Sequence, residues 1–96
     1  MSGTTDERDD LLDDEAPAPT AEDVLAYLVE SLVDDPDAVE IDSVEGRRGV
    51  TLEVRVASGD MGRVIGRRGR MANAIRTVVR AAAVKDEVTT DVDFVD

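Results

Sequence analysis

The amino-acid sequence predicts one small α+β domain with the element order helix, strand, strand, helix, helix, strand. Apolar residues recur at helical spacing over residues 21–33 and again over residues 69–84. Three other stretches alternate apolar and polar residues, as half-buried strands do. Two glycines, Gly66 and Gly69, separate the long second helix from a shorter one before it. These observations together exclude an all-α or all-β fold.

Size and composition narrow the class of protein. The chain has 96 residues, enough for one core, and it contains no cysteine and no histidine. It therefore lacks disulfides, the commonest metal ligands and the commonest general base, so we expect no enzyme, no cofactor and no metal site. No segment resembles a signal peptide or approaches the roughly 20 apolar residues of a membrane span. We expect a soluble cytoplasmic protein, and marginal stability at this size favours oligomerisation.

Residues 1–19 are expected to form a disordered acidic tail, and residues 20–96 the domain. The tail carries seven acidic residues against one arginine and closes with Pro17 and Pro19. Such a composition buries too little apolar surface to fold. The charge has two interpretations: the tail is a solubilising extension, or it is an intramolecular competitor that contacts basic residues of the domain at low salt.

The first half of the domain is expected to be a helix followed by a hairpin. The helix, residues 21–33, is indicated by the spacing of Val24, Leu25, Leu28, Val29 and Leu32. Thr20 followed by Asp23 resembles a capping box, and Pro36 ends the helix. The pattern places Tyr27 toward the core. Alternation around Val39 and Ile41, and again from Val50 to Val56, predicts two strands joined by the turn 45–49.

The second half is expected to be two helices and a strand. Ser58 and Asp60 are candidate caps of a short helix that ends at Gly66, where a left-handed residue is wanted. The long helix runs from Gly69 to about Val84. Its predicted apolar face comprises Met71, Ile75, Val78, Val79 and Ala82. The final strand includes Val88, Val92 and Phe94, with Phe94 toward the core and Asp91 and Asp93 facing out.

The stretch GRVIGRRGRMANAIRTVVR, residues 62–80, has six arginines and no acidic residue in a chain of net charge -12. A bend between two helices exposes backbone N–H groups at the start of the second helix, where the helix dipole favours anions. Glycines on both sides allow positive φ and a close approach of a phosphodiester, and Arg67 and Arg68 add charge and forked donors. This chemistry suits a nucleic-acid backbone better than a small metabolite.

VIGRRGRMANAI, residues 64–75, resembles the signature of KH domains: an apolar pair, a G-x-x-G loop, a basic residue and an apolar helix. With the preceding hairpin, the N-terminal helix and IRTVVRAAA, residues 75–83, the chain is similar over about residues 20–96 to the small bacterial single-KH RNA-binding proteins of the KhpA family. The resemblance implies a type II-like KH fold, with a three-stranded sheet and three helices packed on one face.

The resemblance also implies a function and a set of site residues. Single-stranded RNA would lie in a groove beside the loop, and the protein would act in post-transcriptional regulation linked to cell elongation. It would form a homodimer or pair with a second KH protein of the KhpB (Jag) family, with no membrane and no small-molecule substrate as partner. The candidate RNA-binding residues are Gly66, Arg67, Arg68, Gly69, Arg70, Arg63, Val64, Ile65 and Asn73.

Two other function classes stay open at this point. One is a KH module whose main role is dimerisation or partner binding, which the strong net negative charge favours because it repels RNA. The other is a DNA-binding helix-turn-helix with its recognition helix starting at Gly69, although the flanking strands fit it poorly. Walker and dinucleotide-binding motifs are excluded, because the required glycines and lysine are absent at their offsets.

Overall fold

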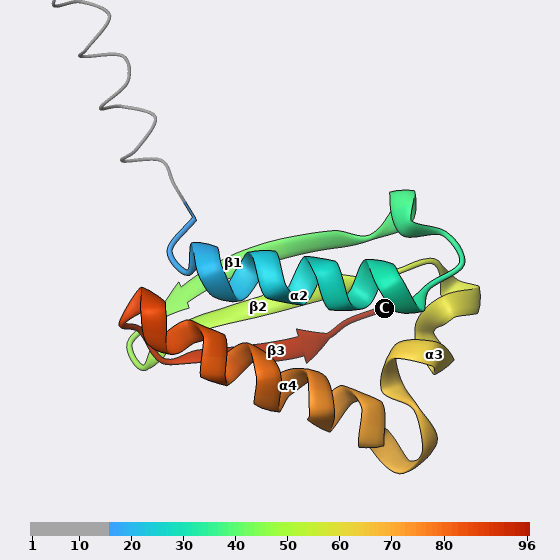
Figure 1. The fold of residues 1–96 in the computed structure, drawn as a ribbon. Coiled ribbons are helices and arrows are strands. Elements are labelled where there is room, and N and C mark those ends of the chain that lie inside the picture. The colour runs from blue at the N-terminus through green and yellow to red at the C-terminus, as the bar shows by residue number, and fades with distance from the viewer. Residues whose placement is uncertain (1–15) are drawn as a thin grey trace, which may run out of the picture.

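The computed structural model describes residues 16–96 and confirms the predicted α+β element order over this range (Figure 1). Residues 1–15, most of the predicted acidic tail, lie outside the described part. The helices and strands are α2 (Pro19–Leu32), β1 (Glu40–Gly46), β2 (Gly49–Arg55), α3 (Met61–Ile65), α4 (Arg70–Ala82) and β3 (Thr90–Phe94). Short 3-10 turns link them: η1 (Pro36–Ala38), η2 (Ser58–Asp60), η3 (Arg67–Gly69) and η4 (Ala83–Asp86).

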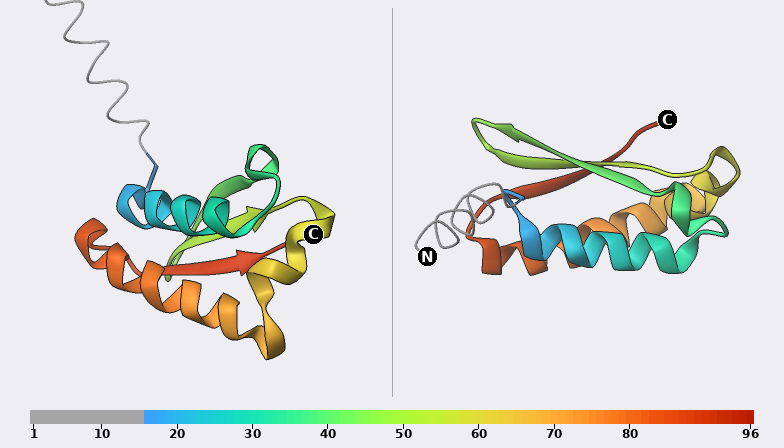
Figure 2. Two further views of the ribbon diagram at one scale, coloured as in Figure 1. Left: turned by 45° about the vertical axis from the view of Figure 1, so that its right-hand side comes forward. Right: turned by 90° about the horizontal axis from the view of Figure 1, so that it is seen from above.

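The strands form one mixed sheet in the order β1-β2-β3. The β1–β2 hairpin is antiparallel, from Glu40 opposite Arg55 to Gly46 opposite Gly49. The β2–β3 pair is parallel, and a parallel pair requires a crossover connection, which α3 and α4 supply. Helices α2 and α4 lie side by side on one face of the sheet, as Figures 1 and 2 show. The two-layer arrangement is that expected of a type II-like KH domain.

The core lies between the helices and the sheet. Alternate residues of β2, Val50, Leu52 and Val54, are buried against the helices. The largest fully buried side chains are Leu25, Leu52, Val29, Val54, Val64 and Val79. Val64 is the fully buried side chain of α3, and Met61 and Ile65 pack against the core beside it. These contacts anchor the short helix and thereby position the bend that follows it.

The N-terminus of α2 differs from the expectation. The helix begins at Pro19, and Ala18 before it is completely buried, so the ordered unit starts before residue 20. No side chain of the helix caps this end, so the capping box predicted from Thr20 and Asp23 is wrong. The carboxylate of Asp86 accepts the first N–H groups instead. Because Asp86 lies 66 positions from Thr20 in the sequence, no local sequence pattern indicates this cap.

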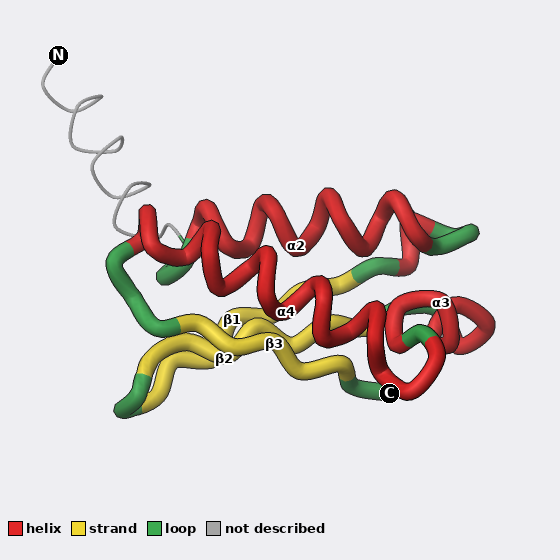
Figure 3. Tube along the Cα trace, turned by 60° about the horizontal axis from the view of Figure 1, so that its bottom comes forward, coloured by secondary structure: helices red, strands yellow, loops and turns green. Residues whose placement is uncertain are grey.

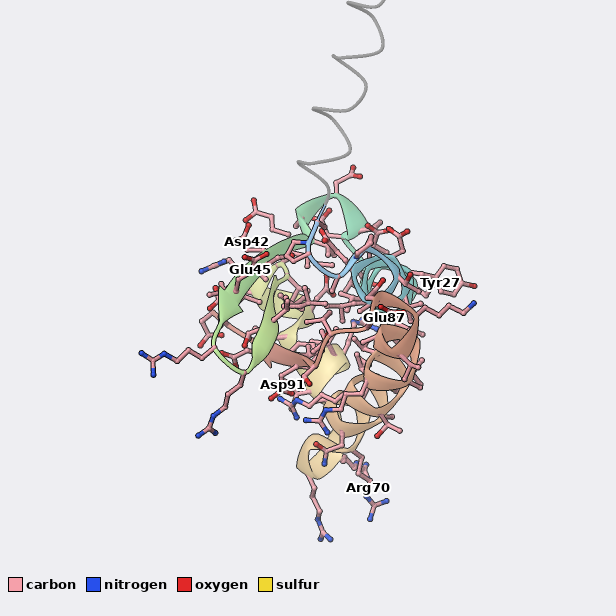
Figure 4. The ribbon with its side chains drawn as sticks, turned by 90° about the vertical axis from the view of Figure 1, so that its left-hand side faces the viewer. Tyr27, Asp42, Glu45, Arg70, Glu87 and Asp91 are labelled. Carbon is pink, nitrogen blue, oxygen red and sulfur yellow. The ribbon has the colours of Figure 1, made fainter. Side chains whose placement is uncertain are left out.

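Tyr27 lies on the outer side of α2, which contradicts its predicted place in the core. Its side chain is 71% exposed, while Leu25 and Val29 are the core residues of this helix. Figure 4 shows Tyr27 pointing away from the domain. The other aromatic residue, Phe94, is half-buried on β3. Neither ring is therefore a fully buried core residue.

Different structural elements lie at the two ends of the domain. The bend between α3 and α4 lies at one end, and the tip of the β1–β2 hairpin lies at the other, the end at which α4 finishes (Figure 3). Within residues 16–96, none of the helices has the length and hydrophobicity needed to cross a membrane.

Candidate nucleic-acid interface

The bend between α3 and α4 depends on Gly66. Its φ of 74° and ψ of 176° are a combination that residues with a Cβ rarely adopt. A Cβ at this position would stand 2.7 Å from the Cβ of Met71 and 2.9 Å from its backbone nitrogen. Gly66 is therefore required twice over, by its conformation and by the close approach of α4. The expectation of a terminating glycine with positive φ is confirmed, although its ψ is extended rather than left-handed.

The last two residues of the loop, Arg68 and Gly69, also have positive φ. Arg68 has φ 56° and ψ 27°, and Gly69 has φ 75° and ψ 13°, so both occupy the left-handed region. A Cβ on Gly69 would meet nothing within 4 Å, so its conformation alone selects glycine there. An arginine held at positive φ is uncommon and is expected where a functional constraint offsets the local strain.

The bend presents three arginines to solvent. Arg67, Arg68 and Arg70 are all exposed, and within residues 16–96 none of them forms an ion pair. Figure 4 shows Arg70 projecting away from the body of the domain. The N-terminus of α4, Gly69 and Arg70, has no side-chain cap and no acidic residue in its first turn. Charge, free donors and the positive end of the helix dipole therefore coincide at this end.

Arg63, also predicted to bind RNA, has carboxylate partners within the domain. Its Nη2 lies 2.9 Å from Asp34 Oδ2, and its Nε lies 3.3 Å from Asp60 Oδ1. Asp60, expected to cap α3, is buried and accepts the backbone N–H groups of Asp34 and Asp35, each at 3.1 Å. The predicted cap is wrong: this cluster ties the end of α2 to the start of α3. Arg63 thus helps to hold α3, the helix before the loop, against the end of α2.

The apolar residues predicted beside the loop separate into two groups. Val64 and Ile75 are buried in the core, so neither has surface for a ligand. Ile65 is half-buried and packs against the core. Of the apolar pair, only Ile65 is therefore open to a ligand.

A groove lies between α4 and the free edge of β3. We call it the α4–β3 groove; its lining residues are Thr51, Asn73, Arg76, Thr77, Arg80, Asp91, Val92 and Asp93. The lining is largely polar. Asn73, a predicted site residue, is exposed in it, and its Oδ1 accepts a hydrogen bond of 3.1 Å from Arg76 Nη1. The groove offers hydrogen-bonding groups rather than an apolar platform.

Arg76 and Arg80 form the wall of this groove, and neither was among the predicted site residues. Arg76 Nε donates to the carbonyl oxygen of Val92 at 3.1 Å, and the guanidinium lies 5.5 Å from the ring centroid of Phe94. Arg76 thus supplies a hydrogen bond to a backbone carbonyl on β3, which is an edge strand of the sheet. The signal in the sequence is the spacing of Asn73, Arg76 and Arg80, which puts three polar side chains on one helix face.

The ion pair between Arg80 and Asp91 crosses the groove. Arg80 Nη2 lies 2.8 Å from Asp91 Oδ1, which also accepts the N–H of Val92 at 3.1 Å. The Arg80 hydrogen bond lowers the pKa of Asp91; burial opposes this effect, and the pKa stays below its ordinary value. The carboxylate is therefore charged at neutral pH, and its charge is matched by the arginine beside it.

A second, apolar surface lies on the other side of α4. We call it the α2–α4 strip; it is lined by Leu28, Ser31, Leu32, Met71, Ala74, Ile75 and Val78. Met71 and Val78, both on the predicted apolar face of the helix, are 36% and 47% exposed. The apolar face of α4 is therefore wider than the part that the sheet covers.

Comparison with known proteins gives one consistent result. The family model described as "KhpA/KhpB, KH domain" matches residues 22–94. A protein of Clostridium acetobutylicum is 47% identical over 72 residues, which are 75% of this chain and 96% of the relative. One from Streptomyces coelicolor is 55% identical over 60 residues, 62% and 76% of the two chains. Both relatives bear the name "RNA-binding protein KhpA". No solved structure matches this chain.

Proposed function

This chain belongs to the KhpA/KhpB family of KH domains, and from that premise we propose that it binds single-stranded RNA through the loop Gly66–Gly69. The family resemblance inferred from residues 64–75 is thereby confirmed. The curated relatives are named as RNA-binding proteins and not as enzymes, in line with the composition. The single observation that carries the proposal is the bend itself, which holds three exposed arginines around an uncapped helix N-terminus.

The loop contacts the phosphate backbone. Gly69 leaves room for a phosphodiester beside the backbone, since nothing lies within 4 Å of the place a Cβ would take. Arg67 and Arg68 precede it in the loop, and Arg70 lies in the first turn of α4. A G-x-x-G loop holds about four nucleotides. Bases then lie toward the α4–β3 groove, where Asn73 and Thr77 supply hydrogen-bonding groups.

Base stacking contributes little to this interaction. Aromatic platforms add about 1 to 3 kcal/mol per base. Here Tyr27 lies on α2, outside the groove, and Phe94 is half-buried near Arg76. Recognition rests on phosphate contacts and hydrogen bonds, so one copy of the domain binds with at best micromolar affinity, on the order of -8 kcal/mol. Such contacts tolerate many sequences, which suits a post-transcriptional regulator or RNA chaperone in the cytoplasm.

A titration with single-stranded RNA tests the proposal. Arg67→Gln with Arg68→Gln should abolish binding at moderate salt while the fold is kept, because both side chains are exposed. Arg55→Gln is the matched control, since Arg55 pairs with Asp42 on the sheet and not at the bend. If about four phosphates are neutralised, the logarithm of the binding constant should fall with the logarithm of the salt concentration at a slope of about -3. Unchanged affinity in the folded double variant would remove the loop from the mechanism.

The cellular role needs a different measurement. Crosslinking in cells, followed by identification of the attached RNA and protein together, distinguishes regulation of transcripts from a purely protein-binding role. Recovery of RNA fragments linked to residues near the bend supports the proposal, including the expected link to cell elongation if the transcripts encode that machinery. Recovery of protein alone, with a KhpB-type partner or a second copy, supports the alternative.

The alternative function is self-association through the α2–α4 strip, and the exposure of Met71 and Val78 favours it. Burial of this strip against the same strip of a second copy would form a two-fold symmetric interface. The dimer would carry two loops, and linking two sites raises avidity by roughly 10² to 10⁴. Sedimentation with and without RNA distinguishes the roles: a dimer that ignores RNA at low salt favours the interaction module.

A further inference from the structure

A second pair of exposed arginines lies at the opposite end of the domain from the bend. Arg47 and Arg48 form the two-residue turn of the hairpin, between Gly46 and Gly49, which are paired across the strands. Within residues 16–96 neither arginine forms an ion pair, although Glu45 is adjacent in the chain. Two like charges at one tip repel each other, so their side chains favour an anion between or beside them.

The turn is held in place by a close backbone contact with the start of β3. Gly49 has φ 140°, and a Cβ there would stand 2.1 Å from the carbonyl oxygen of Thr89. The next residue, Val50, donates its N–H to the same oxygen at 2.8 Å. Only glycine allows this approach. The contact fixes the hairpin tip against the segment that leads into β3, at the end of the α4–β3 groove.

The tip and the groove are continuous. Arg47 and Arg48 line a hollow that also includes Thr51 and Asp91, and these last two residues line the α4–β3 groove as well. Arg76 and Arg80 lie along the groove between the two ends. Helix α4 has 13 residues and spans about 20 Å. Arginines therefore recur from the bend, along one side of α4, to the hairpin tip.

We propose that a single-stranded RNA longer than the segment held by the loop continues along the free edge of β3, and that Arg47 and Arg48 bind its phosphates. This inference rests on the proposed function and extends it by a second, independent phosphate site. The interaction surface is thus longer than one G-x-x-G loop, which holds about four nucleotides.

The acidic residues near this path restrict it to the edge of the sheet. Asp91 lies on the path, but Arg80 pairs with it at 2.8 Å. Glu53 on β2 and Asp93 on β3 alternate with buried residues, so they lie on the face of the sheet away from the helices, and Asp93 also borders the α4–β3 groove. Their charge repels RNA from that face and leaves the edge beside α4 as the favourable route.

The test is the dependence of affinity on RNA length. Wild type and the variant Arg47→Gln with Arg48→Gln are titrated with unstructured RNA of about four and about twelve nucleotides. We expect the variant to bind the short RNA as wild type does, and the long RNA about tenfold more weakly at 0.1 M salt. Loss of two phosphate contacts should also reduce the salt slope for the long RNA by about 1.4.

Each outcome decides between the two proposals. Arg55→Gln, on the same hairpin and of the same charge change, should leave both affinities unchanged. If the double variant keeps the wild-type affinity for long RNA, or loses affinity for both lengths equally, the second site is wrong while loop binding stands. If wild type binds neither RNA, the proposed function itself is wrong. Thermal unfolding of each variant verifies that the hairpin is still folded.

Discussion

The carboxylate of Asp86 caps the N-terminus of α2, whose residue Thr20 lies 66 positions earlier in the chain. Asp86 Oδ1 accepts the N–H of Thr20 at 3.0 Å, and Oδ2 accepts that of Ala21 at 2.9 Å. The negative charge also complements the positive end of the α2 dipole. The connection between α4 and β3 is thereby fastened to the first helix, so one residue joins the two halves of the domain.

Asp86→Ala should destabilise the domain by about 0.5 to 2 kcal/mol at neutral pH, the usual effect of losing an N-terminal cap. Urea unfolding measures it, and Asp37→Ala is the control, because Asp37 is exposed on η1 and caps no helix among residues 16–96. A loss no larger than that of the control would show that water replaces the carboxylate without cost.

The contribution of Asp86 should disappear in acid. Burial raises the pKa of this carboxyl, but the hydrogen bonds from Ala21 and Thr20 lower it more, so it lies below the ordinary 3.8. A lowered pKa in the folded state means that the stabilisation is complete above 3.8 and is lost as pH falls through the folded value. The difference between wild type and Asp86→Ala should therefore shrink toward zero below this range. A difference that persists there would assign it to packing.

Gly66→Ala should cost more stability than Gly69→Ala. Each places a residue with a Cβ in a sparsely populated backbone region, at a cost of about 1 to 3 kcal/mol. At Gly66 the new Cβ would also stand 2.7 Å from Met71, whereas at Gly69 it meets nothing within 4 Å. Chemical unfolding gives the order, with Gly59→Ala as a control of open surroundings. Equal losses at Gly66 and Gly69 would contradict the close packing of the bend on α4.

Sequence patterns predicted those features that depend on neighbouring residues. Alternation along β2 and the glycines of the bend located the hairpin, the helices and the loop. They failed where the partner is distant in sequence, as in the cap that Asp86 provides for α2 and the hydrogen bonds that Asp60 accepts from Asp34 and Asp35. Tyr27 was predicted to face the core yet faces solvent. Periodicity shows that a helix has an apolar face, but not how wide a part of it the sheet covers.

Arg63→Gln and Arg67→Gln should change different properties, the first the stability of the domain and the second its affinity for RNA. Arg63 bridges Asp34 and buried Asp60, so its loss should lower stability by about 1 kcal/mol and change RNA affinity little. Arg67 is exposed at the loop, so its loss should lower affinity and leave stability unchanged. Thermal unfolding and RNA titration of both variants give the comparison. An equal loss of RNA affinity in the two folded variants would show that Arg63 contacts RNA despite its carboxylate partners.

Val78→Glu should convert a self-associating protein into a folded monomer. Val78 is 47% exposed at the centre of α4 on the α2–α4 strip, so a charge there is tolerated in the monomer, but it would be desolvated at an interface. Val84→Glu is the matched control, since Val84 is 74% exposed and lies outside the strip. Sedimentation gives the mass of each variant. Because Val78 lies about two turns along α4 from the loop, Val78→Glu should keep the affinity for a four-nucleotide RNA. It should lose only the avidity for longer RNA that a second loop supplies. An unchanged mass, or dissociation in both variants alike, would place the interface elsewhere and leave the exposed apolar residues of α4 without a role in assembly.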